Sequence, residues 1–264
     1  MKNKGIIIAL IVLLIIIIIG LIGLLVFSIN GGINFSKGFM NIEKRSDTII
    51  FDKYYETVDI NSLEIISDAG DVSFEKTSEE NIRIQVYGKN SEDVKVNTLE
   101  NKIKLECKSN KKSWFNFNFY KNDIVVYVPE SYLGEIKVQN DYGNVEMGSF
   151  ENTTIDVKSD CGNIEIEKAK NVTIKCDYGN VEIDTILNKC DIKSDCGNIE
   201  IEEAVLKENS IIKSDLGNVE IKKINDIHID TEVDLGKTDI KQNNRASNVT
   251  LKIEADCGNI TIGE

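Results

Sequence analysis

One short phrase, Asp-x-Gly-Asn followed by alternating apolar and polar residues, recurs eight times in this 264-residue chain. Two copies differ at the last position, where Asp71 and Lys237 replace Asn. The glycines of the phrase are Gly70, Gly143, Gly162, Gly179, Gly197, Gly217, Gly236 and Gly258, and from Gly143 onward they step by 17 to 22 residues. A repeat of this period indicates stacked structural units rather than one globular core.

The residues around each glycine alternate with the period of a β-strand. In residues 154–167, apolar or small side chains occupy every second position on both sides of Gly162. Glycine suits a tight turn there because it adopts positive φ at low cost. We therefore predict an all-β fold, a repeat β-solenoid with two strands per coil of about 19 residues. A meander of β-hairpins closing a sandwich is the alternative.

Stacking turns equivalent positions into columns. We expect the residue between Asp and Gly to form an interior column of Tyr142, Cys161, Tyr178, Cys196, Leu216, Leu235 and Cys257, and the small residues before Asp to let the two sheets converge. An outer column should contain Glu146, Glu165, Glu182, Glu200 and Glu220, about 4.8 Å apart. These glutamates are either a solvated face that discourages sheet association or a weak surface for Ca²⁺ or polycations. A lysine row (Lys158, Lys175, Lys193, Lys213) should stack on the other strand.

The N-terminal region carries a predicted membrane anchor. Residues 6–27 are apolar and uncharged, and as a helix these 22 residues span roughly 33 Å, enough for a bilayer core. We predict a single-pass transmembrane helix with a cytoplasmic N-terminus and an extracytoplasmic C-terminal part. The expected domains are an anchor (1–27), a linker (28–47) and a solenoid (48–264), irregular with an aromatic insertion over 48–135 and regular over 136–264.

Charge and residue types limit the function classes. The chain has 31 basic and 44 acidic residues, and Lys2 and Lys4 are the only charges before residue 28, so the remainder has a net charge of −15. Such acidity disfavours nucleic acid and anionic lipid, and suits cations or a basic partner. The single histidine, His228, and three arginines share no catalytic motif. We predict no enzymatic activity, no cofactor and no metal site, and we read the six cysteines as small buried residues rather than disulfides.

One aromatic cluster interrupts the irregular part. It contains Trp114, Phe115, Phe117, Phe119 and Tyr120. Its Phe side either covers an end of the solenoid, or the cluster contacts a protein partner, a glycan or a lipid headgroup.

Several of these segments together resemble a known family. Residues 63–72, 112–117 and 126–129, followed by the repeated Asp-x-Gly-Asn, are similar to the bacterial putative-adhesin β-strand-repeat domains, relatives of the toast-rack domains, over roughly residues 48–264. The resemblance implies an envelope-associated β-solenoid, often linked with cell-envelope stress systems. It supplies no catalytic residues.

The last strand of the repeat, residues 260–262, ends next to Glu264 without a capping segment. An unpaired strand edge there invites strand addition or self-association. The sequence thus predicts a membrane-anchored extracytoplasmic binding or sensing module, adhesin-like or associated with envelope stress. Its expected partners are the membrane through residues 6–27 and an envelope protein or a cell-wall polymer. The alternative is a structural protein that assembles end to end through an uncapped terminal coil.

Overall fold

The structure is a computed structural model that describes residues 48–108 and 121–263. The predicted anchor at 6–27, the linker at 28–47 and the aromatic residues Trp114 to Tyr120 lie outside the described residues. Within the described ranges, no helix is long and apolar enough to cross a membrane.

The described residues form strands and one short 3₁₀ turn, η2 (Ser91–Asp93). The strands of the first part are β1 (Ile49–Glu56), β2 (Ser62–Ser67), β3 (Val72–Thr77), β4 (Asn81–Tyr87), β5 (Val94–Leu99), β6 (Lys102–Cys107), β7 (Asp123–Pro129) and β8 (Glu135–Tyr142). Those of the regular repeats are β9 (Val145–Cys161), β10 (Ile164–Tyr178), β11 (Val181–Cys196), β12 (Ile199–Ala204), β13 (Ser210–Leu216), β14 (Val219–Ile224), β15 (His228–Leu235), β16 (Thr238–Ile240), β17 (Thr250–Cys257) and β18 (Ile260–Ile262).

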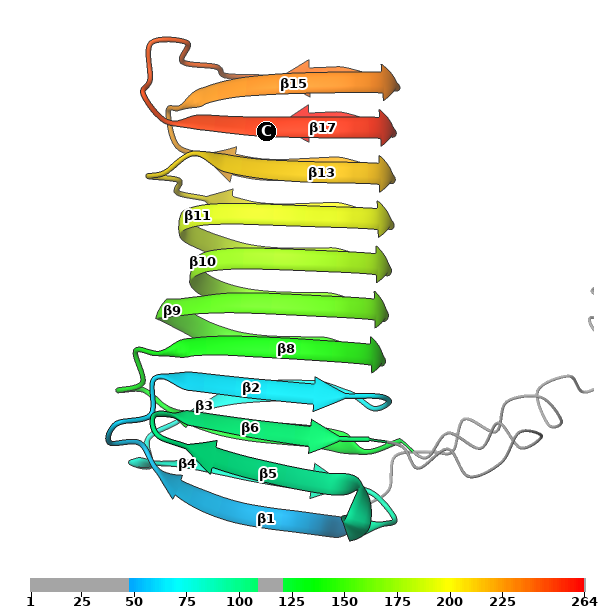
Figure 1. The fold of residues 1–264 in the computed structure, drawn as a ribbon. Coiled ribbons are helices and arrows are strands. Elements are labelled where there is room, and N and C mark those ends of the chain that lie inside the picture. Colours follow the sequence, from blue (N-terminus) through cyan, green and yellow to red (C-terminus); the bar gives the residue numbers. More distant parts are fainter. Residues whose placement is uncertain (1–47, 109–120, 264) are drawn as a thin grey trace, which may run out of the picture. The chain divides into compact units, whose positions relative to one another are not determined.

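Successive coils pair in parallel, so the predicted β-solenoid is confirmed and the sandwich of hairpins is wrong. β10 pairs in parallel with both β9 and β11 over two stretches. One stretch follows the corner at Gly162, and the other leads to the corner at Gly179. Figure 1 shows the coils as a ladder of strands with the corners on one side. Within the long strand β10 the pairing register shifts between Ala169 and Asn171.

The C-terminal coil is not the end of the stack. β17 pairs with β13 on one side and with β15 on the other (Figure 1). β18 lies between β14 and β16 in the same way. The prediction that residues 260–262 form an open edge, and hence an uncapped terminal coil, is therefore wrong. The chain first forms the end coil, which consists of β15 and β16. Residues 241–249 then return the chain to the stack, where β17 and β18 insert next to the end coil.

The connection that returns the chain also covers part of the new edge. The Asn243 side chain accepts a hydrogen bond from the Ile229 N–H (3.0 Å) and donates one to the Ile229 C=O (2.6 Å). The Asn244 N–H donates to the Ile227 C=O (3.0 Å). These bonds satisfy some of the backbone hydrogen-bonding groups in the first half of edge strand β15. Its second half exposes Glu232 and Asp234, charges that oppose strand addition.

The N-terminal end follows the same plan. β2 lies between β6 and β8, and β3 lies between β7 and β9, so the first coil of the sequence is again inserted. Antiparallel strands then finish this end, with β5 on β6, β4 on β7 and β1 on β4. Arg83 of β4 holds Asp52 of β1 with two hydrogen bonds of 2.9 and 2.7 Å.

The interior is narrow and consists mainly of Ile and Val from alternate strand positions. At the corner, as predicted, the residue before Asp is small or polar and buried in most coils (Asn140, Ser159, Cys176, Ser194, Ser214 and Ala255). These residues let the two sheets converge. The corner glycines are stacked so closely that a Cβ atom on Gly162, whose φ is +146°, would overlap the carbonyl oxygen of Gly143.

Candidate functional site

The asparagine of each repeat has a structural role at the corner. Its side-chain oxygen accepts a hydrogen bond of 2.9–3.0 Å from the backbone N–H of the same position in the next coil. This ladder contains Asn144, Asn163, Asn180, Asn198, Asn218 and Asn259, and Asp71 and Asp123 extend it toward the N-terminal end. It stops at Lys237, whose backbone N–H donates to the Asn259 side-chain oxygen (3.0 Å) and whose side chain has no acceptor to offer. The replacement of Asn by Lys therefore coincides with the last coil of the stack.

The column between Asp and Gly is not interior, contrary to the prediction. Tyr142, Tyr178, Leu216 and Leu235 are 53%, 63%, 55% and 70% exposed. Cys161, Cys196 and Cys257 are half-buried. Where the two sheets converge, the small buried residue before Asp already fills the interior, so the next apolar side chain stays on the outside of the bend. We call these seven residues the corner ridge.

The order of side chains along the corner ridge becomes regular only in space. Strand pairing places them as Tyr142, Cys161, Tyr178, Cys196, Leu216, Cys257 and Leu235. A large apolar side chain thus alternates with a cysteine along the whole series. In the sequence this alternation is hidden, because Leu235 precedes Cys257.

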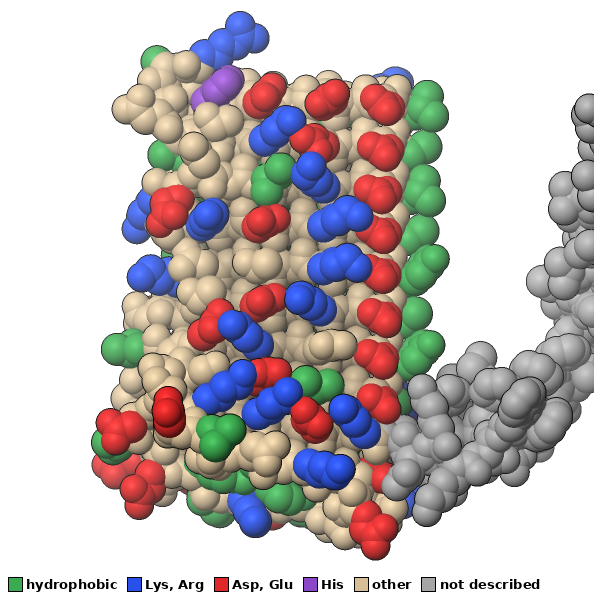
Figure 2. Space-filling model, in the orientation of Figure 1, with side chains coloured by type: hydrophobic (Ala, Val, Ile, Leu, Met, Phe, Trp, Pro, Cys, Tyr) green, Lys and Arg blue, Asp and Glu red, His purple; other side chains and the backbone are tan. Residues whose placement is uncertain are grey.

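A row of carboxylates runs beside the corner ridge. Each ridge residue follows an aspartate of the repeated phrase, and this aspartate row contains Asp141, Asp160, Asp177, Asp195, Asp215, Asp256 and Asp234 in spatial order. Figure 2 shows acidic and hydrophobic side chains as two adjacent columns along one edge of the solenoid. Three of the aspartates form ion pairs with the lysine row: Lys175–Asp177 and Lys193–Asp195, both at 2.7 Å, and Lys193–Asp215 at 3.8 Å.

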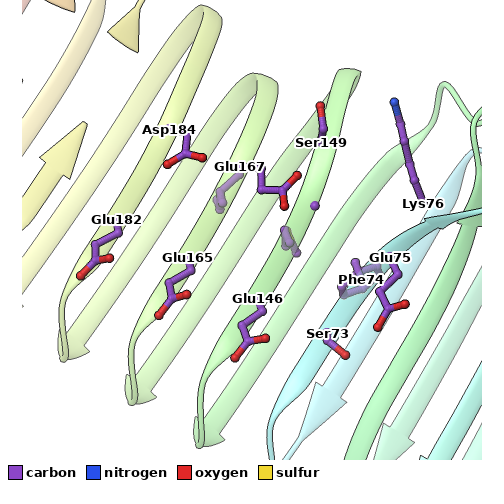
Figure 3. A pocket seen from close by; sticks show the side chains of 13 residues that line it. Ser73, Phe74, Glu75, Lys76, Glu146, Ser149, Glu165, Glu167, Glu182 and Asp184 are labelled. Atoms are coloured by element: carbon purple, nitrogen blue, oxygen red, sulfur yellow. The ribbon is translucent and has the colours of Figure 1, made fainter. Parts of the chain in front are cut away.

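The predicted glutamate column lies in register on the other sheet. Glu146, Glu165, Glu182, Glu200 and Glu220 pair with one another in successive coils. The first three line a hollow of about 490 Å³ together with Glu75, Glu167 and Asp184. Gly148, opposite Glu167, also lines the hollow and contributes no side chain to it. Figure 3 shows the carboxylates side by side along neighbouring strands.

The carboxylates of this acidic hollow run parallel and do not converge on a point. No group of three or more potential ligands in the described part of the chain is close enough to hold a metal ion. Farther along, Lys222 forms an ion pair with Glu200 (2.6 Å) and a second one with Glu202. These two carboxylates raise the pKa of Lys222, Glu200 having the larger effect. The arrangement is suited to diffuse attraction of cations rather than to a coordinated ion.

The cysteines form two classes, and all six are free thiols. Cys107, Cys176 and Cys190 are buried as expected, and burial raises their pKa to about 12, 11 and 12. The three others belong to the corner ridge and are solvent-accessible. Because two coils separate each from the next, roughly 9.6 Å, they lie beyond the Cα separation of a disulfide.

The structure thus brings three of the five predicted acidic residues into one hollow, and it reveals a surface that the sequence reasoning placed inside. His228 lies in edge strand β15, with its Nδ1 atom 3.4 Å from the Thr250 hydroxyl. The candidate site is therefore the corner ridge with its aspartate row, and the acidic hollow is a second charged surface.

The chain matches several solved structures and one family profile. The solved structures of a "putative adhesin" from Bacteroides fragilis (16% identity, 85% of this chain and 100% of the other, TM-score 0.48) and of a "putative lipid binding protein" from Parabacteroides distasonis (13%, 82% and 98%, 0.43) are among the matches. A "putative cell adhesion protein" from Clostridium sporogenes also matches (14%, 81% and 97%, 0.34). Comparison with curated proteins finds no match. The family profile described as Toastrack DUF4097 covers residues 60–263, and the chain belongs to this Toastrack family.

Proposed function

We propose that this Toastrack protein is a membrane-anchored binding module whose solenoid lies outside the cytoplasm, and that it acts without catalysis. The apolar segment at residues 6–27 supports the anchor, since its length matches a bilayer core. The solenoid begins soon after it, at residue 49.

The observation that carries the proposal is the corner ridge. Four large apolar side chains, each more than half exposed, stand in one line on every second coil, with the half-buried ridge cysteines on the coils between them. Folding alone does not require them, because the equivalent cysteines leave the coil geometry unchanged. A contiguous line of exposed apolar groups next to a regular row of charges is typical of an interaction surface.

The location can be tested with the ridge cysteines. A membrane-impermeant maleimide added to intact cells should label Cys161 and Cys257 of the full chain, since both are half-exposed. The buried Cys190 serves as the internal control and should stay unlabelled. Deletion of residues 6–27 should move the protein out of the membrane fraction. Labelling that appears only after permeabilisation would refute the extracytoplasmic location.

Binding can be tested in living cells by site-specific photo-crosslinking. A benzoylphenylalanine at position 178 replaces a tyrosine that is 63% exposed on the ridge. The same residue at position 173 replaces an exposed threonine on the same strand but away from the ridge. We expect a discrete adduct from position 178 and none from 173. Equal yields at the two positions, or no adduct at either, would contradict a ridge-based binding function.

A further inference from the structure

Large and small side chains alternate along the corner ridge. Each cysteine is flanked by two large side chains, so Cys161, Cys196 and Cys257 mark three recesses between Tyr142, Tyr178, Leu216 and Leu235. Successive recesses are two coils apart, which is roughly 9.6 Å at the usual strand spacing. A ligand that lies lengthwise on the ridge would place an apolar group in each recess at this interval.

Charge stands beside the recesses. Asp160 precedes Cys161 and Asp256 precedes Cys257, and both aspartates are exposed. Among the described residues neither forms an ion pair, whereas Asp195, beside the middle recess, is held by Lys193 at 2.7 Å. The complementary ligand therefore combines apolar groups with positive charge at the outer two recesses.

The spacing selects one backbone conformation. A polyproline II helix has three residues per turn and rises about 3.1 Å per residue, so every third side chain recurs at about 9.3 Å. Over the two intervals between three recesses, the mismatch with the ridge is only about 0.6 Å. An extended strand repeats a face at about 6.7 Å. An α-helix presents the same face again after two turns, at about 10.5 Å. Over the same two intervals its mismatch with the ridge is about 1.8 Å.

We propose that the corner ridge binds a basic polyproline II segment of a partner polypeptide. Apolar side chains at every third position enter the recesses at Cys161, Cys196 and Cys257, and the neighbouring Lys or Arg side chains reach the aspartate row. This inference rests on the proposed binding function and specifies its ligand. An anionic lipid surface fits less well, because the aspartate row repels it.

A second copy of the chain also fits less well. The ridge is one side chain wide and about 29 Å long over its six steps, which falls well short of the roughly 800 Å² per partner of a stable interface. Two copies would in addition bring surfaces of the same charge together.

The test uses the full chain in phosphatidylcholine nanodiscs and a fluorescent peptide of four Pro-Lys-Leu triplets. Two control peptides have the same length: four Pro-Glu-Leu triplets reverse the charge, and three Pro-Lys-Lys-Leu units place Leu at every fourth position. We expect anisotropy to show binding of the first peptide that weakens with salt, and at least about tenfold weaker binding of both controls. Bound peptide should also protect Cys161 from maleimide without changing Cys190.

Two variants locate the binding on the protein. Cys196→Leu fills the middle recess at a solvent-accessible position and should weaken binding about tenfold. The double variant Asp160→Asn with Asp256→Asn should weaken it similarly and reduce its salt dependence. Glu79→Gln with Glu203→Gln removes the same charge from exposed positions elsewhere and should leave binding unchanged. A thermal melt of each variant separates misfolding from loss of the site.

The outcomes separate this inference from the function it rests on. Equal affinity for the three peptides, or unchanged affinity in both ridge variants, overturns the polyproline II proposal. If the photo-crosslinked adduct at position 178 still forms in cells, the proposed binding function is supported, and the ligand is of a different kind. An adduct that contains lipid, or a second copy of the chain confirmed by sedimentation, also overturns the proposal.

Discussion

The corner glycines of successive coils bring backbone close to backbone, and Gly162→Ala tests this approach. The new methyl group would overlap the carbonyl oxygen of Gly143, whereas carbon–oxygen contacts between strands normally lie at about 3.3–3.6 Å. The coils must then separate locally. The Gly143 N–H bond to the Cys161 C=O (2.9 Å) and the Val145 N–H bond to the Asn163 C=O (2.9 Å) would both be stretched.

The expected loss of stability can be worked out from these contacts. The two backbone hydrogen bonds and the Asn163 N–H bond to the Asn144 side chain (3.0 Å) contribute about 1 kcal/mol each. An alanine at φ of +146° adds about 1–3 kcal/mol of backbone strain. The total is about 4–6 kcal/mol, or a fall in melting temperature of roughly 8–24 °C for a domain of this size.

Gly148→Ala is the matched control. A Cβ atom there would lie 3.5 Å from the Phe74 carbonyl oxygen and 3.9 Å from the Glu167 carboxylate, both ordinary contacts. We expect its melting temperature to stay within a few degrees of the wild type, by circular dichroism of the purified full chain. Hydrogen exchange should rise near residues 143–164 in Gly162→Ala only, because coils of a solenoid open locally. If the two variants had the same melting temperature, the close stacking of the corner glycines would not be a determinant of stability.

Three further predictions follow from the same geometry. Asn198→Ala removes the acceptor for the next coil's corner N–H (2.9 Å) and should destabilise the protein by about 1 kcal/mol in denaturant unfolding, whereas a loss below the error of the measurement would deny the ladder a role. Native Cys190, with its pKa raised to about 12 by burial, should resist maleimide at neutral pH while Cys161 reacts, as intact-mass spectrometry can check; equal rates would contradict the assigned burial. Hydrogen bonds from Lys213 and then Lys252 lower the pKa of Glu254, so its stabilising effect is present above the unfolded value of about 4.3 and is lost as the pH falls through the lower folded value. Glu254→Gln should therefore reduce the loss of stability between pH 5 and pH 3, and an unchanged pH profile would show that these ion pairs contribute nothing.

The sequence by itself determined the unit of the fold. Strict alternation on both sides of Gly162 predicts two strands and a tight corner, because side chains on a strand point alternately to its two faces. The recurrence of the phrase every 17 to 22 residues predicts that these units stack. It also predicts the register of the glutamate column and of the lysine row, since equivalent positions next to the corner align when the coils stack.

Only the tertiary structure decided which coils are neighbours. All coils carry the same pattern, so the sequence does not distinguish a C-terminal coil added at the end from one inserted between β13 and β15. Insertion depends on pairing across 41 residues, as in the Asn259 N–H bond to the Asn218 side chain. The one local sign is Lys237, which lacks the side-chain acceptor of the other coils.

The candidate site was decided by tertiary structure for the same reason. Period-two alternation places Tyr178 inside, but the convergence of the sheets around Cys176 leaves no room for it. The alternation of large side chains with cysteine along the ridge exists only after Cys257 is inserted between Leu216 and Leu235. A local pattern can specify each strand, whereas the surface that a stack presents depends on how distant strands are ordered within it.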